Sequence, residues 1–275
     1  MQTVRKATTS VTVRVVTADS STVRPDKVAT EEPLSIRAGG PGQDNADVTV
    51  TMRTPGHDFE LAVGFLWSEN LITDPAQVRE VKFCDVPDGE EQRYNIVTVR
   101  TAHHLTVRQR AFTTTSSCGV CGTQTLDDLA ACTIPVPPGL YRIRATDLLA
   151  VPDVLRERQK VFASTGGLHA AAALDSDGQV LLSREDVGRH NAVDKVVGRL
   201  VLDSNVPAHK RALFVSGRTS YEIVQKAAVA GISLVAGVSA PSSLAVETAD
   251  RMGITLAGFV RGGSMNVYTH PERIV

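Results

Sequence analysis

The sequence predicts an α/β fold in which a largely parallel β-sheet, covered by helices, follows a smaller α+β region. Three observations lead to this prediction. Strand and helix patterns alternate regularly after about residue 150, whereas strand patterns dominate the part before residue 133. Residues 134–139, which contain three prolines and a glycine, separate the two parts. We therefore expect two domains, residues 1–133 and residues 134–275, the second with helices on both faces of its sheet.

The N-terminal part begins with strand patterns. Val11, Val13 and Val15 alternate with polar residues, as expected for a strand with one buried face. Residues 31–36 and 48–52 are two further stretches of strand character. This part is therefore rich in strands.

One helix pattern interrupts these strands. Thr54 has a side chain suited to a helix N-cap and Pro55 suits the first helical position, so we expect a helix from there to about Asn70. Residues 94–99 and 105–108 then resemble a hairpin that leads into a loop of small and polar residues.

The C-terminal part is more regular. A helix around residues 152–162 is followed by Gly166 and Gly167, which are typical of a helix end, and residues 169–174 and 180–183 form a second hairpin pattern. The remaining elements alternate as a helix near residues 192–201, a strand at 212–215, a helix near 223–228, a strand at 234–238, a helix near 244–252 and a strand at 256–260. Strands joined by helices in this way form parallel sheets.

Composition excludes several classes of protein. The net charge of −1 and the pI near 6.7 provide no basic surface for nucleic acid. No apolar run approaches the length of a membrane span, and the first residues lack the apolar segment of a signal peptide. We expect a cytoplasmic protein with no membrane association.

The loop after the first hairpin contains a single C-x-x-C motif, formed by Cys118 and Cys121. Serine, threonine and glycine surround the pair, so the segment cannot bury much apolar area. Arg108 and Arg110 precede it and would favour the thiolate, which is the reactive form of cysteine. The motif predicts two reactive thiols that exchange or carry sulfur.

Three other readings of the motif stay open. It could be half of a zinc site, although the other candidate ligands, Cys84, Cys132, His103 and His104, form no second C-x-x-C. It could be a structural disulfide, which is uncommon in the cytoplasm. It could also be a thioredoxin-like redox motif, which would open a helix within a βαβ unit.

Polar loops follow each of the predicted C-terminal strands. They are residues 184–191, 216–220, 239–243 and 261–266. The carboxyl ends of parallel strands meet at one edge of a sheet, where ligands bind. These loops are rich in Arg, Gly, Ser and Asn, which suit an anion such as a phosphate, although polar turns favour the same residues. His190, at a helix start, could contact a ligand or be a solvated cap.

Several of these segments resemble the formate dehydrogenase accessory sulfurtransferase family (FdhD). The resemblance rests on the run of residues 184–195, on residues 214–218 and 258–263, and on Cys118 and Cys121, and it covers nearly the whole chain. Members of that family resemble cytidine deaminases in their larger part. The resemblance therefore implies a cytidine-deaminase-like, three-layer α/β/α domain after the smaller α+β domain.

The resemblance also implies a function. A cysteine desulfurase would pass sulfur to Cys118 as a persulfide, and Cys121 would assist as the second thiol. The acceptor would be the molybdenum cofactor in its bis(molybdopterin guanine dinucleotide) form, before insertion into formate dehydrogenase, and GDP would mimic part of that ligand. The residues that match the family's cofactor-binding segment are Phe259, Val260, Arg261, Gly262, Gly263 and Ser264. We expect a homodimer.

Two alternatives come from other classes. One is a nucleotide-binding regulatory module whose C-x-x-C senses redox state. The other is a zinc-dependent deaminase, which needs a histidine or cysteine at one helix start and a C-x-x-C at the next. Here the two helix starts offer only His190 as a ligand, so we expect no metal in this domain.

Overall fold

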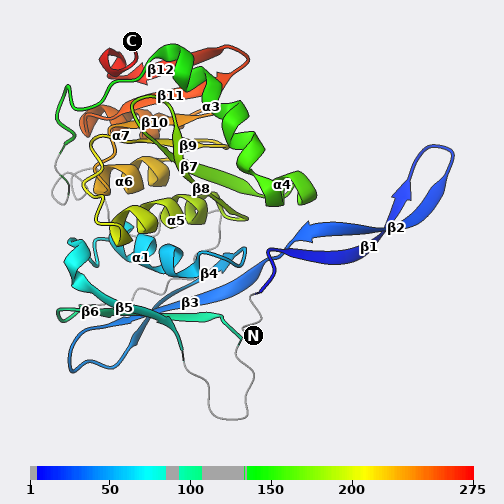
Figure 1. Ribbon diagram of the computed structural model, residues 1–275, viewed down its shortest axis with the longest axis horizontal. Helices are drawn as coiled ribbons and strands as arrows, with labels where there is room; N and C mark the ends of the chain where they lie inside the picture. The colour runs from blue at the N-terminus through cyan, green and yellow to red at the C-terminus, as the bar shows by residue number, and fades with distance from the viewer. Residues whose placement is uncertain (1–4, 85–92, 107–132, 134) are drawn as a thin grey trace.

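The computed structural model describes residues 5–84, 93–106, 133 and 135–275. Two β-sheets and a layer of helices between them form the body, and a third, two-stranded sheet projects from it as an arm (Figure 1). None of the helices in the described part of the chain is long and apolar enough to cross a membrane.

The larger sheet has six strands in the order β12-β11-β10-β9-β7-β8. Its strands are β7 (His169–Leu174), β8 (Val180–Asp186), β9 (Ala212–Val215), β10 (Leu234–Gly237), β11 (Thr255–Arg261) and β12 (Ser264–Thr269). The three central strands, β9, β10 and β11, are parallel, whereas β7 and β12 run antiparallel to their neighbours. The sheet is therefore mixed around a parallel centre, because one hairpin adds β12 at one side and the β7–β8 hairpin adds two strands at the other.

Helices cover both faces of this sheet. The helix α3 (Ala145–Arg158) packs on one face, where Leu148, Val151 and Leu155 meet Phe214 and other side chains of the strands. The opposite face is covered by α5 (Arg189–Leu202), α6 (Tyr221–Val229) and α7 (Ser243–Arg251). These layers agree with the expectation of helices on both faces; the finer likeness to cytidine deaminases stays a prediction.

The smaller sheet lies beyond the helices and has the order β4-β3-β6-β5. Its strands are β3 (Glu32–Gly39), β4 (Ala46–Arg53), β5 (Val78–Phe83) and β6 (Ile96–Thr101), and the short turn η1 (Pro75–Gln77) precedes β5. The helix α1 (Asp58–Ser68) fills the space between this sheet and α5, as the stacking in Figure 1 shows. One of the apolar core clusters contains residues of both parts of the chain. The division into two domains at residues 133 and 134 stays a prediction.

Two glycines allow α1 and α5 to approach each other closely. A Cβ atom added at Gly64 would lie 1.9 Å from the carbonyl oxygen of Asp194, and one at Gly198 would lie 1.8 Å from that of Glu60. Both distances are far below contact distance, so only glycine fits at either position. The two helices therefore touch through their backbones.

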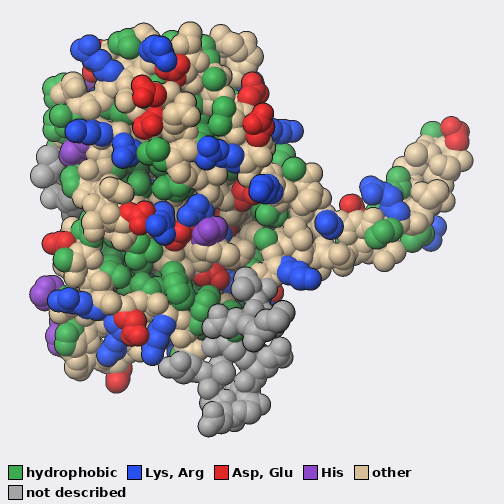
Figure 2. Space-filling view, in the orientation of Figure 1, with side chains coloured by type: hydrophobic (Ala, Val, Ile, Leu, Met, Phe, Trp, Pro, Cys, Tyr) green, Lys and Arg blue, Asp and Glu red, His purple; other side chains and the backbone are tan. Residues whose placement is uncertain are grey.

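The arm consists of β1 (Thr8–Val16) and β2 (Ser21–Ala29), paired antiparallel along their whole length. It leaves the body near α4 (Lys160–Thr165) and extends into solvent (Figure 1). Figure 2 shows apolar and basic side chains along it. Val16 and Val23 are 70% and 62% exposed, so the ribbon has almost no core of its own.

The structure corrects several predicted elements. The first helix begins at Asp58 with His57 as its N-cap, so Thr54 and Pro55 are not its first residues. The helix expected at residues 152–162 begins at Ala145 and is interrupted at Gln159, after which α4 runs to Thr165.

The strands also differ from the predictions. The segment expected at residues 105–108 is not a strand at Leu105 and Thr106, and its other two residues lie outside the described part. The strands β2 and β5 were not predicted, and β12 follows where only a polar loop was expected.

We predict that Gly198→Ala lowers the free energy of unfolding by about 1–3 kcal/mol, because the added methyl group would force α1 and α5 apart. Urea denaturation followed by circular dichroism measures the change. Gly167→Ala is the matched control, since its added Cβ would meet only ordinary contacts at 3.8 and 3.9 Å. Equal stability of the two variants would contradict close backbone packing of the helices.

Candidate functional site

The strands β8, β9, β10 and β11 all end at the same edge of the larger sheet, because they run in one direction. The loops after β9 and β10 contact each other, because Ser242 N donates to Thr219 O at 3.0 Å. Phe259, near the end of β11, donates from its N to Ser239 O in the loop after β10 at 3.2 Å. The expectation that these polar loops gather at one edge is confirmed, and we call this the ligand edge.

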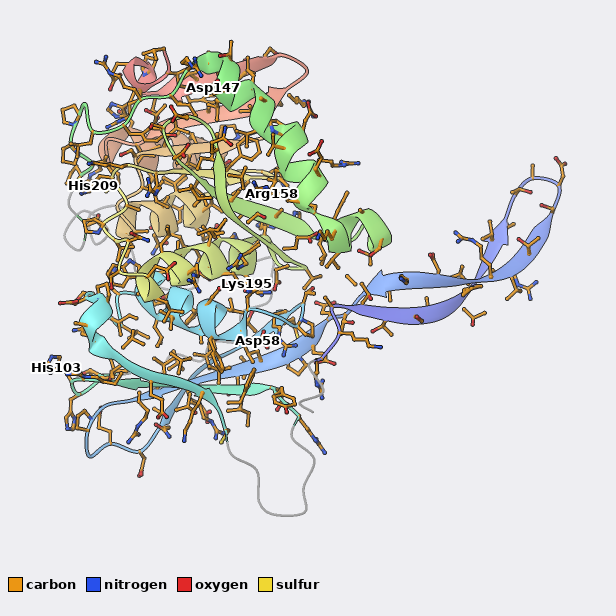
Figure 3. The ribbon with its side chains drawn as sticks, viewed as in Figure 1. Asp58, His103, Asp147, Arg158, Lys195 and His209 are labelled. Atoms are coloured by element: carbon orange, nitrogen blue, oxygen red, sulfur yellow. The ribbon has the colours of Figure 1, made fainter. Side chains whose placement is uncertain are left out.

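The loop after β8 is held by the carboxylate of Asp186, which is fully buried. It accepts hydrogen bonds from Gly188 N at 2.8 Å, from Asn191 Nδ2 at 3.2 Å and from Thr54 N at 3.2 Å. Lys195 Nζ lies 2.7 Å from Asp186 Oδ2 and also donates to the carbonyl oxygen of Thr54 at 2.9 Å. Figure 3 shows Lys195 between the layers of α5 and α1. Asp186 and Lys195 therefore anchor the ligand edge to the smaller sheet.

The two residues before Asp186 have similar anchoring roles. Arg184 donates to both carboxylate oxygens of Glu60 on α1, at 2.5 and 2.7 Å. Burial alone would raise the pKa of Glu60, but the hydrogen bonds from Arg184 and His57 outweigh it and lower this pKa to about 2. Glu185 accepts from the backbone N–H groups of Val161 and Phe162, at the start of α4. Much of the run of residues 184–195 is therefore structural.

His190 lies within this framework but faces the next loop. Its Nε2 is 3.2 Å from Ser220 Oγ and 3.6 Å from a carboxylate oxygen of Glu222. Burial, together with the positive charges of Lys226 and Arg189, lowers the pKa of His190 to about 4. The imidazole is therefore neutral at pH 7 and can donate or accept one hydrogen bond at each nitrogen.

The starts of α5 and α6, which correspond to the two zinc-binding helix starts of a deaminase, lie next to each other in the structure. His190 is in the first turn of α5, and Ser220 is the N-cap of α6. Within the described ranges, no group of three or more His, Cys, Asp or Glu side chains is arranged to hold a metal ion. Cys84 and His103, two of the candidate ligands, lie after β5 and β6 of the smaller sheet; the absence of a metal stays a prediction.

The segment from Phe259 to Ser264 turns the chain from β11 into β12. Gly262 and Gly263 have φ angles of 59° and 76° and form a two-residue turn that joins the paired Arg261 and Ser264. Of the predicted binding residues, Val260 points into the core, whereas Arg261, both glycines and Ser264 are exposed.

Phe259 has an unusual backbone conformation. Its φ angle is 54°, a left-handed value that costs a bulky residue about 1–2 kcal/mol. A β-bulge between Gly258 and Arg261 accompanies it, and the Arg261 guanidinium lies 5.5 Å from the centre of the Phe259 ring. Strain of this kind is concentrated at functional sites. This strain could not be predicted from the sequence, because it is visible only in the φ angle of the folded backbone.

The ligand edge carries positive charge that is free to bind an anion. Arg156, Arg218 and Arg261 surround it and are exposed, and in the described part of the chain none of them forms an ion pair with a carboxylate. The buried cations Lys195 and Lys226, in contrast, pair with Asp186 and Asp194. An anionic ligand would therefore meet unpaired arginines at this edge.

Cys118 and Cys121 lie outside the described residues, and so do Cys132, Arg108 and Arg110. Their roles stay predictions.

Comparison with known proteins gives consistent results. The model of the FdhD/NarQ family matches residues 29–275. A protein of Mycobacterium tuberculosis named sulfur carrier protein FdhD is 48% identical over 271 residues, which cover 95% of this chain and 96% of that protein. A protein of Saccharolobus solfataricus with the same name is 44% identical and covers 90% of this chain and 91% of its own. A crystal structure from Desulfotalea psychrophila, described as a formate dehydrogenase accessory protein, covers 98% of this chain and 100% of its own with a TM-score of 0.77 and 22% identity, which shows the same fold.

We predict that His190 makes the stability of the protein depend on pH. In the unfolded chain its pKa is ordinary, about 6.5, and in the folded protein it is about 4. Between these values the unfolded state binds more protons, so stability is retained above pH 6.5 and is lost as the pH falls. The loss between pH 7 and pH 5 should be about 1–2 kcal/mol, and His190→Gln should remove it.

Urea denaturation at pH 7, 6 and 5 measures this difference. His104→Gln, at an exposed position after β6 of the smaller sheet, is the control for the substitution itself. The same slope in wild type and in His190→Gln would contradict a depressed pKa.

Proposed function

The chain belongs to the FdhD/NarQ family, and from this membership we propose that it is a sulfur carrier that serves the maturation of formate dehydrogenase. The observation that carries the proposal is the identity of 44–48% to proteins named sulfur carrier protein FdhD, over about nine tenths of each chain. The C-x-x-C motif supplies the chemistry that such a carrier needs.

The first proposed step is the loading of Cys118. Its thiolate attacks the outer sulfur of a persulfide on a cysteine desulfurase. The S–S bond of the donor breaks, the donor cysteine leaves as a thiolate, and Cys118 becomes a persulfide. No net oxidation or reduction takes place.

In the second step the outer sulfur is released to the acceptor. The Cys121 thiolate attacks the inner sulfur of the Cys118 persulfide, so that a Cys118–Cys121 disulfide forms and sulfide leaves. The two thiols supply the two electrons, and a cellular dithiol must reduce the disulfide before the next cycle. The acceptor we propose is the bis(molybdopterin guanine dinucleotide) form of the molybdenum cofactor, bound as a substrate.

We assign the phosphorylated part of this substrate to the ligand edge. The arginines described above could neutralise phosphates, and the strained Phe259 with the exposed turn at Gly262 and Gly263 presents backbone groups and Arg261 to it. His190 is neutral at pH 7 and adds no charge. GDP should mimic the guanine nucleotide end.

The remaining proposals concern architecture and setting. The part from residue 134 onward, with helices on both faces of its sheet, supports a relation to cytidine deaminases. We propose a homodimer that acts in the cytoplasm, with a cysteine desulfurase as sulfur donor and formate dehydrogenase as the recipient of the sulfurated cofactor.

Removal of Cys118 tests the sulfur-carrier function. We predict that Cys118→Ala, after incubation with a desulfurase and cysteine, carries no sulfane sulfur above background, whereas wild type carries about one per chain. Cyanolysis measures this sulfur. Cys84→Ala is the control and should load normally, since Cys84 lies beside β5 in the smaller sheet.

Formate dehydrogenase activity in cells that lack the native protein provides a second readout. Cys118→Ala should give none, Cys121→Ala a reduced level and Cys84→Ala the full level. Full activity with Cys118→Ala would refute the persulfide role. Cysteines that oxidise reversibly but never acquire sulfane sulfur would favour a redox-sensing regulatory module.

Substitutions at Gly263 test whether the ligand edge binds GDP. A side chain at Gly263 would find open space in the free protein, but it would occupy the position that a ligand must approach. We predict that Gly263→Asn, which tolerates a positive φ, weakens GDP binding at least tenfold with little loss of stability. Gly263→Val should weaken binding and stability together.

Calorimetric titration with GDP, beside a melting curve, measures both quantities. Gly42 is the matched control position, because it has a φ of 71° and open space around its Cβ, but it lies in the smaller sheet. Gly42→Val should melt lower and bind GDP normally. Normal GDP binding by Gly263→Asn would remove this turn from the site.

A further inference from the structure

The arm formed by β1 and β2 has an apolar face that lies outside the body of the protein (Figure 1). Residues opposed across an antiparallel ribbon point to the same face. One face is made of four opposed pairs, which are Thr9 with Val28, Val11 with Asp26, Val13 with Arg24 and Val15 with Thr22. We call it the valine face. None of its valines belongs to the apolar core clusters of the described part of the chain.

The valine face lacks the cover that a stable ribbon needs. A two-stranded ribbon is only marginally stable in water, because it has no second layer to bury its apolar side chains. Val28 is 41% exposed, and Val11, Val13 and Val15 are only partly buried. The strands nevertheless pair over nine residues, which gives the arm a reach of about 30 Å. An apolar face of this length indicates a surface that packs against another molecule.

The arm also differs in charge from the rest of the protein. Residues 5–29 contain five basic and two acidic side chains, which gives them a net charge of +3. The whole chain has a net charge of −1, so the remaining residues carry −4. The body of a second copy of this chain therefore has the charge that attracts the arm.

The order of residues along the valine face makes this face complementary to itself. A twofold axis at the middle of the arm would stack two valine faces antiparallel, with each β1 over the partner's β1. Val11 would then meet the partner's Val13, and Asp26 would meet the partner's Arg24. Within one arm, Arg24 Nη1 and Asp26 Oδ1 are 3.9 Å apart and both side chains are exposed, so each is available to the partner.

The other surfaces of the arm do not show this complementarity. On the opposite face, the same axis would place the apolar Val23 against the partner's charged Lys27. At the free edge of β2, Pro25 has no N–H to donate to an added strand. The valine face is therefore the surface of the arm that suits a second copy.

We propose that the valine faces of two copies pack against each other, antiparallel, and join the homodimer. The inference rests on the proposed function for the homodimer, and it adds the surface that holds the two copies together. Apart from its last residue, the arm precedes the part of the chain that the family model matches, so this surface does not follow from family membership.

The length of the arm sets the extent of this contact. Two faces of this size cover about 600 Å² in total, which is about half of the smallest area that a stable interface buries. Because the axis lies at the middle of the arm, the arms overlap completely and each tip reaches the partner's body. Contacts at the two tips supply the remaining area.

Val13→Glu tests the valine face. It should raise the dissociation constant of the dimer about tenfold or more, because it buries a charge without a partner. Sedimentation over a range of protein concentrations measures the constant, and circular dichroism checks that the variant is folded. Val23→Glu is the matched control, because Val23 is 62% exposed on the opposite face and its replacement should leave the constant unchanged.

An exchange of charges tests the antiparallel arrangement. Arg24→Asp and Asp26→Arg would each bring like charges together across the axis and should each weaken the dimer about tenfold or more. The double variant Arg24→Asp/Asp26→Arg restores opposite charges and should dimerise within about threefold of wild type. Lys27→Asp changes the net charge as Arg24→Asp does, but on the opposite face, and should have the smaller effect.

Three results would overturn the inference. The first is a wild type that sediments as a monomer at every concentration, which would leave the arm to a different protein. The second is a dimer that Val13→Glu leaves intact or that Val23→Glu dissociates equally. The third is a double charge variant that dimerises no better than the single variants.

Sulfane sulfur on Cys118, measured on the same preparations, tests the proposed function separately. A dimer that depends on Val13 but never loads sulfur would support the arm interface and refute the carrier. A monomer that loads sulfur would refute the arm interface and support the carrier.

Discussion

The buried carboxylate of Asp186 is the group on which the arrangement of the ligand edge depends. It gathers donors from two regions of the chain: Thr54 on one side, and Gly188, Asn191 and Lys195 on the other. A buried charge is costly unless it is fully paired, so each of these donors is needed where it lies. The carboxylate thereby fixes the start of α5 against the smaller sheet.

This framework divides the charges of the protein into two groups. Inside, near the ligand edge, Lys195 pairs with Asp186 and Lys226 pairs with Asp194. At the rim, Arg156, Arg218 and Arg261 have no such partner in the described part of the chain. The buried pairs hold the edge in place, and the unpaired arginines at the rim are available to the phosphorylated ligand that we propose. Its binding would require little rearrangement of the protein's own charges.

The sequence allowed some of these features to be predicted, and physical reasons explain the others. The strand β9 was predicted with its exact bounds because a short, fully buried apolar run stands between turn residues. Strand β2 was missed because it contains Pro25 and is exposed along most of its length. Its sequence therefore lacks the alternation of apolar and polar residues that a buried face requires. Thr54 was taken for the cap of its own helix, but its hydroxyl accepts from Val187 N, 133 residues away. The gathering of the polar loops followed from strand direction, whereas the left-handed backbone of Phe259 depends on tertiary contacts that no local pattern contains.

The backbone contact between α1 and α5 has a consequence for how the protein can be divided. The apolar side of α5 is shared between the larger sheet and α1, and Gly64 and Gly198 leave no layer of side chains at the crossing. A fragment that starts at residue 134 would leave this crossing open to water, with bare helix backbone and the surrounding valines uncovered. Such a fragment should aggregate when produced alone, and the two halves should be recovered together when they are co-expressed as separate chains.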